Sequence, residues 1–291
     1  MKNATSSITA EATLVFRAVE SRRPPTKRIA NDYLAPLFLP PQATVIGRTK
    51  IPEPIARWLY NLGFPGVETY LATRTRYFDE CFKTSIENGI TQVVVLGAGY
   101  DSRAYRFSSI NPDCCVFEVD HPATQQVKKE VVRRCFGELP KQIQYVPIDF
   151  HQESLECALH HRGYDATAQT LFLWEGVTYY ISSDAVDATL KYITRNSARK
   201  SLVVFDYTLP QVIEGRCWRR EAILWRKTLV SRGEPILFGI ENDTIQAFLS
   251  KRGFCKIRTH DPRSLFHQYL HNRSLRRKPS PIFSIATANV A

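Results

Sequence analysis

The middle of the chain alternates between short apolar runs and longer amphipathic stretches. Each stretch between two runs is long enough for a helix that crosses over a sheet. Near-continuous apolar runs joined by helices are typical of a parallel sheet that is covered on both faces. Because such crossovers are right-handed, the pattern predicts a doubly wound α/β sheet. The runs span residues 92–96, 115–119, 144–148, 171–174 and 201–205.

The N-terminal region lacks these runs and carries helical spacing instead. Apolar residues recur at near-helical intervals over 70–87, and Asn88-Gly89 ends that helix. A shorter helical pattern opens at 29–34. Prolines interrupt the remainder, because proline cannot continue a helix interior. We therefore expect this region to form a helical cap.

Beyond the fifth run the pattern changes again. Helices are predicted over 217–229 and 244–249, and strands over 254–259 and 281–288. The last two strands would form a hairpin at the edge of the parallel sheet. We expect one seven-stranded domain, made of a helical cap (1–88), a cofactor-binding core (89–209), a lid insertion (210–243) and a closing helix with the strand hairpin (244–291).

Composition narrows the class of protein. Hydrophobic residues make up 44% and charged residues 23%, which excludes collagen-like and wholly disordered chains. The seven cysteines form no CxxC pair and the seven histidines no HExxH motif, so we expect free thiols and no metal site. No apolar run reaches the ~18 residues of a membrane span, and no signal peptide is visible, so we expect a cytoplasmic protein. The formal net charge of +11 favours anionic partners.

Glycines follow the first predicted strand and an acid follows the second. In open α/β sheets ligands bind beyond the carboxyl ends of the strands, so these residues should meet around one ligand. Gly97 and Gly99 allow a tight turn and a close approach of the backbone. Asp120 lies 21 residues beyond Gly99, a spacing at which an acid accepts hydrogen bonds from ribose hydroxyls.

Acids also follow the third and fourth predicted strands. Asp149 can accept from the exocyclic amine of adenine, and Glu175 can hold an ammonium group. The third small residue of a dinucleotide fingerprint would fall at Ser102, so a pyrophosphate fits poorly. A ligand with an adenine, a ribose, a cationic amino-acid tail and no phosphate is S-adenosylmethionine. Taken singly, the glycines are also typical of a structural turn and each acid of a solvated loop.

The same segments resemble the leucine carboxyl methyltransferase family. The resemblance covers about residues 70–210 well and the two ends more loosely. It implies a class I methyltransferase fold with S-adenosylmethionine as cofactor. The family includes protein C-terminal carboxyl methyltransferases and polyketide carboxyl O-methyltransferases. The matching runs are RTRYFD (74–79), VLGAGYDSRAYR (95–106), EVDHP (118–122), PIDF (147–150) and WEGVTYY (174–180).

The resemblance also implies roles for individual residues. It places Gly97 and Gly99 at the methionine end of the cofactor and Glu175 at the methionine amino group. An arginine before the first strand would bind the cofactor carboxylate, because its forked donors match that group. Arg74 is the first choice for this task and Arg76 the second. The remaining implied contacts are Asp120 with the ribose and Asp149 and Phe150 with the adenine.

The expected methyl acceptor is a carboxylate of a small molecule such as a polyketide. A carboxyl group has a pKa of about 4 and is ionised at neutral pH, so methyl transfer to it needs no general base. We expect positioning and exclusion of water instead, and no Lys/His dyad follows a strand. A protein C-terminus is the alternative acceptor. Candidate substrate-binding residues are Tyr179, Tyr180, Tyr207 and Arg216.

Two other classes of function are compatible with parts of the sequence. The positive charge favours a nucleic-acid methyltransferase, but the chain lacks the Asn/Asp-Pro-Pro-Tyr/Phe tetrapeptide and the Pro-Cys loop of such enzymes. We therefore expect no nucleic-acid partner. A non-catalytic binding module is disfavoured by the intact glycines and acids. The sequence leaves the oligomeric state open.

Overall fold

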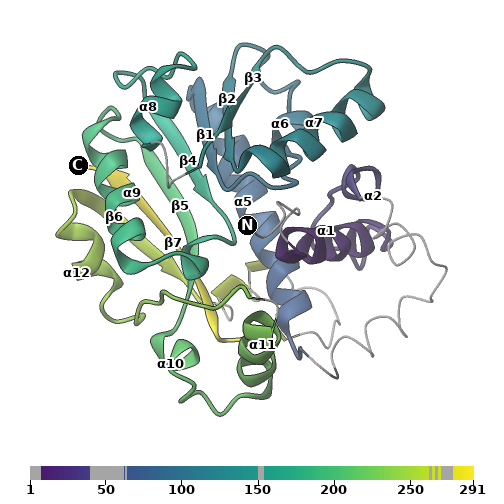
Figure 1. Cartoon of the computed structure of the whole chain (residues 1–291), viewed down its shortest axis with the longest axis vertical. Helices are drawn as coiled ribbons and strands as arrows, with labels where there is room; N and C mark the ends of the chain where they lie inside the picture. The colour runs from purple at the N-terminus through teal and green to yellow at the C-terminus, as the bar shows by residue number, and fades with distance from the viewer. Residues whose placement is uncertain are drawn as a thin grey trace.

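A central sheet of seven strands organises the molecule (Figure 1). The computed structural model describes residues 8–39, 62, 64–149, 154–231, 233–261, 264–265, 268–269 and 278–291. The strands are β1 (Gln92–Leu96), β2 (Cys115–Asp120), β3 (Ile143–Pro147), β4 (Thr170–Trp174), β5 (Leu202–Thr208), β6 (Phe254–His260) and β7 (Phe283–Val290). Their order in the sheet is β3-β2-β1-β4-β5-β7-β6. The first five pair in parallel, whereas β7 is antiparallel to both β5 and β6.

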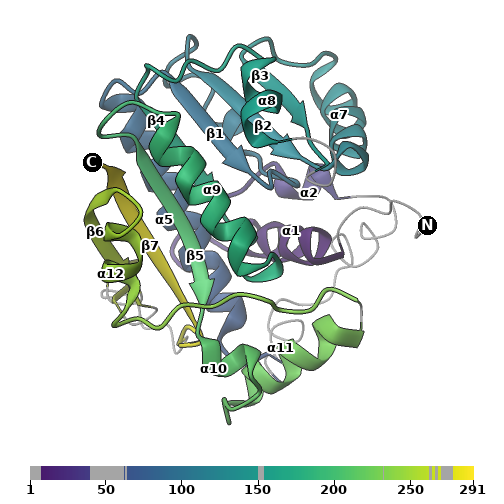
Figure 2. The same cartoon turned by 60° about the vertical axis from the view of Figure 1, so that its left-hand side comes forward.

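Helices cover both faces of this sheet. Figure 2 shows α9 (Ser183–Arg195) on one face and α5 (Val67–Glu87) on the other. The N-terminal helix α1 (Ile8–Ser21) packs against α5 and against α2 (Ala35–Phe38). The other helices with bounds in the described part of the chain are α6 (Arg103–Arg106), α7 (Pro122–Phe136), α8 (Leu155–His160), the 3₁₀ turn η1 (Thr178–Tyr180), α10 (Pro210–Ile213), α11 (Arg220–Ser231) and α12 (Ile245–Ser250).

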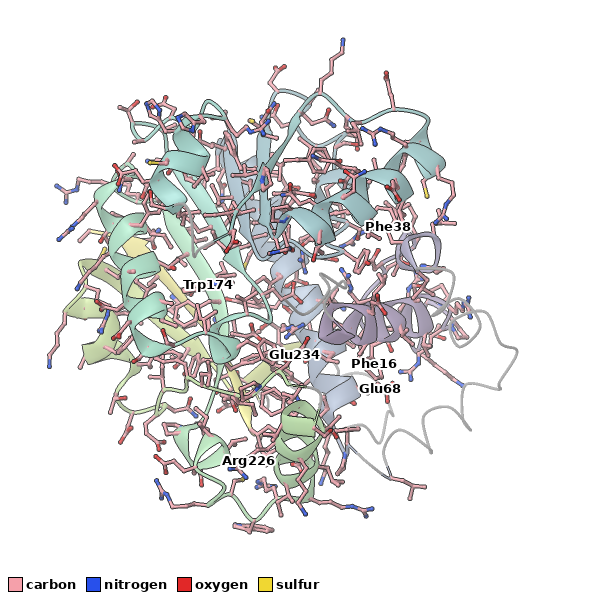
Figure 3. The ribbon with its side chains drawn as sticks, in the orientation of Figure 1. Phe16, Phe38, Glu68, Trp174, Arg226 and Glu234 are labelled. Atoms are coloured by element: carbon pink, nitrogen blue, oxygen red, sulfur yellow. The ribbon has the colours of Figure 1, made fainter. Side chains whose placement is uncertain are left out.

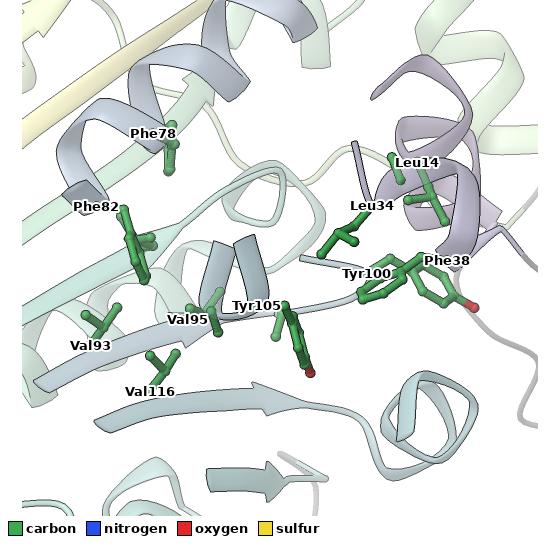
Figure 4. Close-up of a cluster of buried hydrophobic side chains, with 14 of the residues drawn as sticks. Leu14, Leu34, Phe38, Phe78, Phe82, Val93, Val95, Tyr100, Tyr105 and Val116 are labelled. Carbon is green, nitrogen blue, oxygen red and sulfur yellow. The ribbon is translucent and has the colours of Figure 1, made fainter. Parts of the chain in front are cut away.

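Side chains of β1 alternate between two apolar clusters. Val93 and Val95 belong to the cluster under α5, where Phe78 lies with them (Figure 4). Val94 and Leu96 belong to the cluster on the face that α9 covers. Because both faces are buried, a strand here needs apolar residues at every position. This requirement produces the near-continuous apolar runs of the sequence.

The predicted doubly wound seven-stranded α/β sheet is confirmed. β1 has the predicted bounds, and the other strands differ from prediction by a few residues. The short helix expected to open at 29–34 instead forms as α2. Asp32 Oδ1 accepts the Ala35 N–H at 3.1 Å, and Pro36 lies in the first turn of the helix. Proline favours that turn because the N–H it lacks has no partner there.

Three expectations from the sequence concern the cysteines, membrane-spanning helices and the division of the chain into parts. All seven cysteines are free thiols. Within the described residues, no helix is both long and apolar enough to cross a membrane. The division into cap, core, lid and closing hairpin stays a prediction.

Candidate active site

A cavity of about 970 Å³ lies at the carboxyl ends of β1 to β4. Its walls are the segments that follow these strands, parts of α1 and α9, Arg74 of α5, and residues 233–235. Trp174 at the end of β4 and Glu234 beyond α11 contribute to this wall (Figure 3). The predicted residues that line the cavity are Arg74, Gly97, Gly99, Asp120, Asp149, Glu175, Tyr179 and Tyr180.

The turn after β1 requires its two glycines. Gly97 has a φ of +67° and Gly99 a φ of +44°, in the left-handed region that side chains disfavour. A Cβ on Gly97 would overlap Cγ2 of Val177, which follows β4. The backbone of the turn therefore passes close to the next segment of the cavity wall. Only glycine fits at that contact.

Asp120 is held by the backbone at the end of β2. Its Oδ2 accepts the N–H of Gly99, and its Oδ1 accepts the N–H of His121 at 2.6 Å. Burial raises the pKa of Asp120 above its ordinary value, although these two N–H groups lower it. Each carboxylate oxygen keeps a further lone pair. Asp120 thus offers a fixed acceptor to the cavity.

Asp149 also lines the cavity, directly beyond β3. The preceding residue, Ile148, lines it as well, and its N–H donates to the carbonyl of Asp120 at 2.9 Å. This bond fixes the start of the Asp149 segment against the end of β2. Phe150, the next predicted residue, lies outside the described residues.

A guanidinium and two carboxylates meet where β4 and β5 end. Arg74 of α5 donates from Nε to Glu175 Oε1 at 2.8 Å and from Nη1 to Asp206 Oδ2 at 2.7 Å. Burial alone would lower the pKa of Arg74, but Asp206 and Glu175 raise it well above its usual value. Asp206 also accepts the Gly176 N–H at 2.6 Å, which fixes the loop after β4.

The structure separates the two predicted arginines. Arg74 is 2% exposed and lines the cavity. Arg76 lies outside that lining; its side chain is 35% exposed and its guanidinium binds Glu80 at 3.0 Å. Its guanidinium also lies over the ring of Tyr269, 4.5 Å from the centroid. Arg74 is therefore the arginine available to a ligand in the cavity.

Ion pairs continue from Arg74 into the interior, and the cavity lining includes only part of this chain. Glu175 binds a second guanidinium, since Arg103 Nη1 lies 2.7 Å from its Oε2. Burial raises the pKa of Glu175, but Arg103 and Arg74 together hold it below the usual value. Arg103 also binds two further acids. The complete chain of buried ion pairs joins Asp206, Arg74, Glu175, Arg103, Asp101, Asp79, Arg106, Asp32 and Arg17.

Comparison with known proteins assigns the chain to a family. The family profile described as leucine carboxyl methyltransferase matches residues 10–194, which is more than half of the sequence. The chain belongs to this family. The resemblance stated from the sequence is therefore confirmed.

Relatives of known sequence support the same family. A Mycobacteroides abscessus protein named "Putative S-adenosyl-L-methionine-dependent methyltransferase" is 33% identical over 69% of this chain and 66% of its own length. A Bacillus subtilis protein with the same description, YktD, is 27% identical over 76% of this chain and 72% of its length. The chain spans less than half the length of several other relatives; a Mycolicibacterium vanbaalenii protein, for example, is 38% identical over 50% of this chain and 46% of its own length.

Among solved structures, a DUF574 family protein from Streptomyces avermitilis superposes with a TM-score of 0.63. The superposition covers 96% of this chain and 97% of that protein, at 11% sequence identity. At this identity the likeness concerns the fold alone. Together with the strand order, it agrees with the class I methyltransferase fold of the leucine carboxyl methyltransferase family.

Two residues predicted to bind substrate lie away from the cavity of this family member. Tyr207 of β5 is fully buried in the cluster under α9, and its hydroxyl donates to Asn242 Oδ1 at 2.8 Å. Arg216 is exposed beyond α10 and pairs with Glu214. The alternation of side chains along β5 explains the position of Tyr207, because Asp206 and Tyr207 point to opposite faces of the sheet. Neither Tyr207 nor Arg216 is part of the cavity wall.

Sequence reasoning missed two charged groups at the site. Asp206 directly follows the fifth predicted run, so extending the strand-end argument by one strand would have found it. Arg17 of α1 lines the cavity, donates to the carbonyl of Tyr100 at 2.8 Å and pairs with Asp32 at 3.2 Å. No local pattern marks Arg17, because its position depends on how the cap packs on the sheet.

Proposed function

We propose that the chain is an S-adenosylmethionine-dependent methyltransferase that methylates a carboxylate of a small molecule. The observation that carries this proposal is the charge of the cavity lining. Among the described residues, acids outnumber arginines in this lining: the arginines are Arg17 and Arg74, and the acids are Asp101, Asp120, Asp149, Glu156, Glu175 and Glu234. S-Adenosylmethionine has a sulfonium, an ammonium and a carboxylate, and so carries one net positive charge. The acidic lining therefore complements this cofactor.

The donor and acceptor groups of the cavity also suit the parts of the cofactor. Glu175 keeps acceptor capacity for an ammonium group, because a carboxylate accepts about four hydrogen bonds and its two arginines occupy only part of it. Arg74, beside Glu175, is the group for the cofactor carboxylate. Asp120 would bind the ribose and Asp149 the amine of adenine. The names of the relatives favour the same cofactor.

The chain's residues would promote the reaction by position rather than by proton transfer. When bound, the cofactor supplies an electrophilic methyl group on sulfur. An acceptor carboxylate is already ionised, so no side chain has to remove a proton. Alignment of two reactants in one cavity can supply roughly 7–11 kcal/mol in favourable cases. Tyr179, Tyr180 and residues 233–235 line the part of the cavity wall that we assign to the acceptor.

The size of the cavity supports a small acceptor. A volume of about 970 Å³ lies at the upper end of the range of roughly 300–1,000 Å³ for small-molecule sites. Such a volume holds the cofactor and leaves room for a second small molecule. A protein C-terminus is the alternative acceptor, and it would have to thread into the same space.

Two measurements test the proposal in order. Calorimetry with S-adenosylmethionine and with S-adenosylhomocysteine should show one site per chain, and absence of binding by either would end the proposal. Incubation with methyl-labelled cofactor and fractionated extract should then place label in low-mass organic acids. Mild alkaline hydrolysis should release that label as methanol, because methyl esters are labile and methyl ethers are not. Label that resists alkali, or that remains with protein, would contradict the carboxylate of a small molecule.

A further inference from the structure

The outer face of α11 leaves apolar side chains in water. The helix buries Ala222, Trp225 and Leu229 against the rest of the molecule. On the opposite side, Ile223 is 41% exposed and Val230 is 56% exposed. These two residues are seven positions apart, so they share one face of the helix. Figures 1 and 2 both show α11 at the periphery of the molecule beside α10.

An exposed tryptophan precedes this face. Trp218 is 81% exposed, the largest value among the described large hydrophobic side chains. The guanidinium of Arg219 lies 5.2 Å from the centroid of its ring. A tryptophan in water exposes a large apolar area, and such residues cluster at interfaces where one end is apolar and the other wet. The indole thus extends the apolar part of the α11 face.

The charged residues of this region are almost all basic. Between residues 216 and 231 the sequence has five arginines and lysines and one acid, Glu221. Glu221 is 7% exposed and accepts from the hydroxyl of Ser280, so its charge is directed inward. Arg216 pairs with Glu214. The side chains that make up this surface, which we call the α11 surface, are Trp218, Arg220, Ile223, Arg226, Lys227 and Val230.

We propose that the α11 surface binds the anionic face of a lipid bilayer. Interfacial helices combine exposed apolar and aromatic residues with arginine and lysine, and they lie in the plane of the headgroups. Three exposed cations of the α11 surface lie along the helix among Ile223 and Val230, so basic and apolar groups can contact one bilayer surface together. These cations are Arg220, Arg226 and Lys227. A nucleic acid would engage the cations alone and leave the two aliphatic side chains in water. The apolar residues therefore favour lipid.

The position of α11 connects this surface to the cavity. Gly233 and Pro235 follow the helix, are exposed, and line the cavity. A bilayer held by the α11 surface would lie beside this part of the wall. This placement favours acceptor acids that partition into lipid, an inference that rests on the proposed function. Binding of the surface to a bilayer does not itself require methyl transfer, so the two proposals can fail separately.

Vesicle sedimentation tests the surface in the full-length protein without cofactor. The protein should sediment with vesicles of phosphatidylglycerol and phosphatidylcholine, and far less with phosphatidylcholine alone. Binding should weaken as salt rises, because exposed charges are screened. The variant Arg220→Gln/Arg226→Gln/Lys227→Gln should bind the anionic vesicles on the order of 100-fold more weakly, at about fivefold per basic residue.

A matched variant controls for net charge. Arg133→Gln/Lys141→Gln/Arg199→Gln removes three exposed cations distant from α11 and should keep most of the vesicle binding. Equal losses in the two triple variants would overturn the proposal, because attraction would then reflect overall charge.

The tryptophan supplies a second readout that charge does not affect. Brominated lipids should quench the fluorescence of the wild-type protein, and Trp218→Phe should lose that quenching while keeping most of the binding. Quenching that persists in Trp218→Phe would contradict insertion at this surface. Binding to duplex DNA that is tighter than binding to anionic vesicles would overturn the choice of lipid in favour of nucleic acid.

Discussion

Arg103 binds Glu175 from the side opposite Arg74, with Arg103 Nη1 2.7 Å from Glu175 Oε2. Arg103 is fully buried and also binds Asp79 at 2.8 Å and Asp101 at 2.5 Å. The carboxylate that we assign to the cofactor ammonium is thus held by two guanidiniums of the fold itself.

Replacement of Arg103 should reduce stability far more than replacement of an exposed arginine. Arg103→Gln leaves buried carboxylates without their cation, which typically costs about 3–5 kcal/mol in the free energy of unfolding. Arg76→Gln removes a partly exposed pair with Glu80 and the contact with the Tyr269 ring, and should cost about 1 kcal/mol. Urea denaturation measures both. Similar losses in the two variants would show that the ion pairs of Arg103 contribute little.

Asp120→Asn should weaken cofactor binding with little loss of fold. The amide keeps one backbone contact but removes the charge that accepts from ribose hydroxyls. Loss of a hydrogen bond to a charged group costs about 1.5–3 kcal/mol, or about 10- to 100-fold in affinity. Calorimetry with S-adenosylhomocysteine measures this change, and the exposed Asp113→Asn is the control. Unchanged affinity in Asp120→Asn would remove Asp120 from the ribose site.

A side chain at Gly97 should destabilise the protein through contact with Val177. Gly97→Ala forces alanine to a φ of +67° and overlaps Val177 Cγ2. Gly163→Ala imposes a similar φ of +83° with no atom within 4 Å of the new Cβ, so it measures the backbone cost alone. We expect Gly97→Ala to lose about 1–3 kcal/mol more than Gly163→Ala.

The added Val177→Ala substitution should restore part of the stability of Gly97→Ala, because it removes the overlapping methyl groups. Urea midpoints of the single and double variants give the coupling energy. Additive effects of the two substitutions would mean that Val177 does not restrict the turn.

The stability of the protein should depend on pH through Glu118. Burial raises the pKa of Glu118 from 4.5 to about 7, although Lys128, 2.7 Å away, lowers it. Between these two values the folded state binds a proton that the unfolded state has released. The free energy of unfolding should therefore fall as pH rises from 4.5 to about 7, by about 3 kcal/mol in total.

Urea denaturation at several pH values measures this slope. The double variant Glu118→Gln/Lys128→Met removes both members of the pair and should flatten it. Asp101 acts in a separate window, since Arg103 outweighs burial and lowers its pKa to about 2. Its contribution to stability is present above its unfolded pKa of 3.8 and is lost as pH falls toward 2. If the free energy of unfolding of Glu118→Gln/Lys128→Met still falls between pH 4.5 and 7, a group other than Glu118 causes the pH dependence.

Local sequence patterns predict the sheet and the residues at the strand ends. They do not predict contacts between the N-terminal helices and the sheet. Continuous apolar runs mark strands because both faces of a parallel sheet are buried, as Val94 and Val95 show. Gly97, Asp120, Asp149 and Glu175 line one cavity because parallel strands end at the same edge. Their roles in binding stay predictions.

Three residues differ in position from what the sequence suggests. Tyr207 is a candidate substrate-binding residue from the sequence, but side-chain alternation turns Asp206 toward Arg74 and leaves Tyr207 in the cluster under α9. Arg216 is also a candidate, but it is exposed beyond α10 and pairs with Glu214. Arg17 lines the cavity through packing between α1 and the sheet, which no periodicity encodes.

The shared carboxylate of Asp79 has a consequence for how this protein can diverge. Asp79 binds both Arg103 and Arg106, so loss of this one carboxylate would take an acid partner from two buried guanidiniums at once. Neutral drift at these positions should therefore proceed by concerted replacements, in which Asp79 is lost together with an arginine. Homologues that have lost Asp79 should also lack at least one of the two guanidiniums, and where a single arginine is lost with it the net charge of the buried chain stays the same.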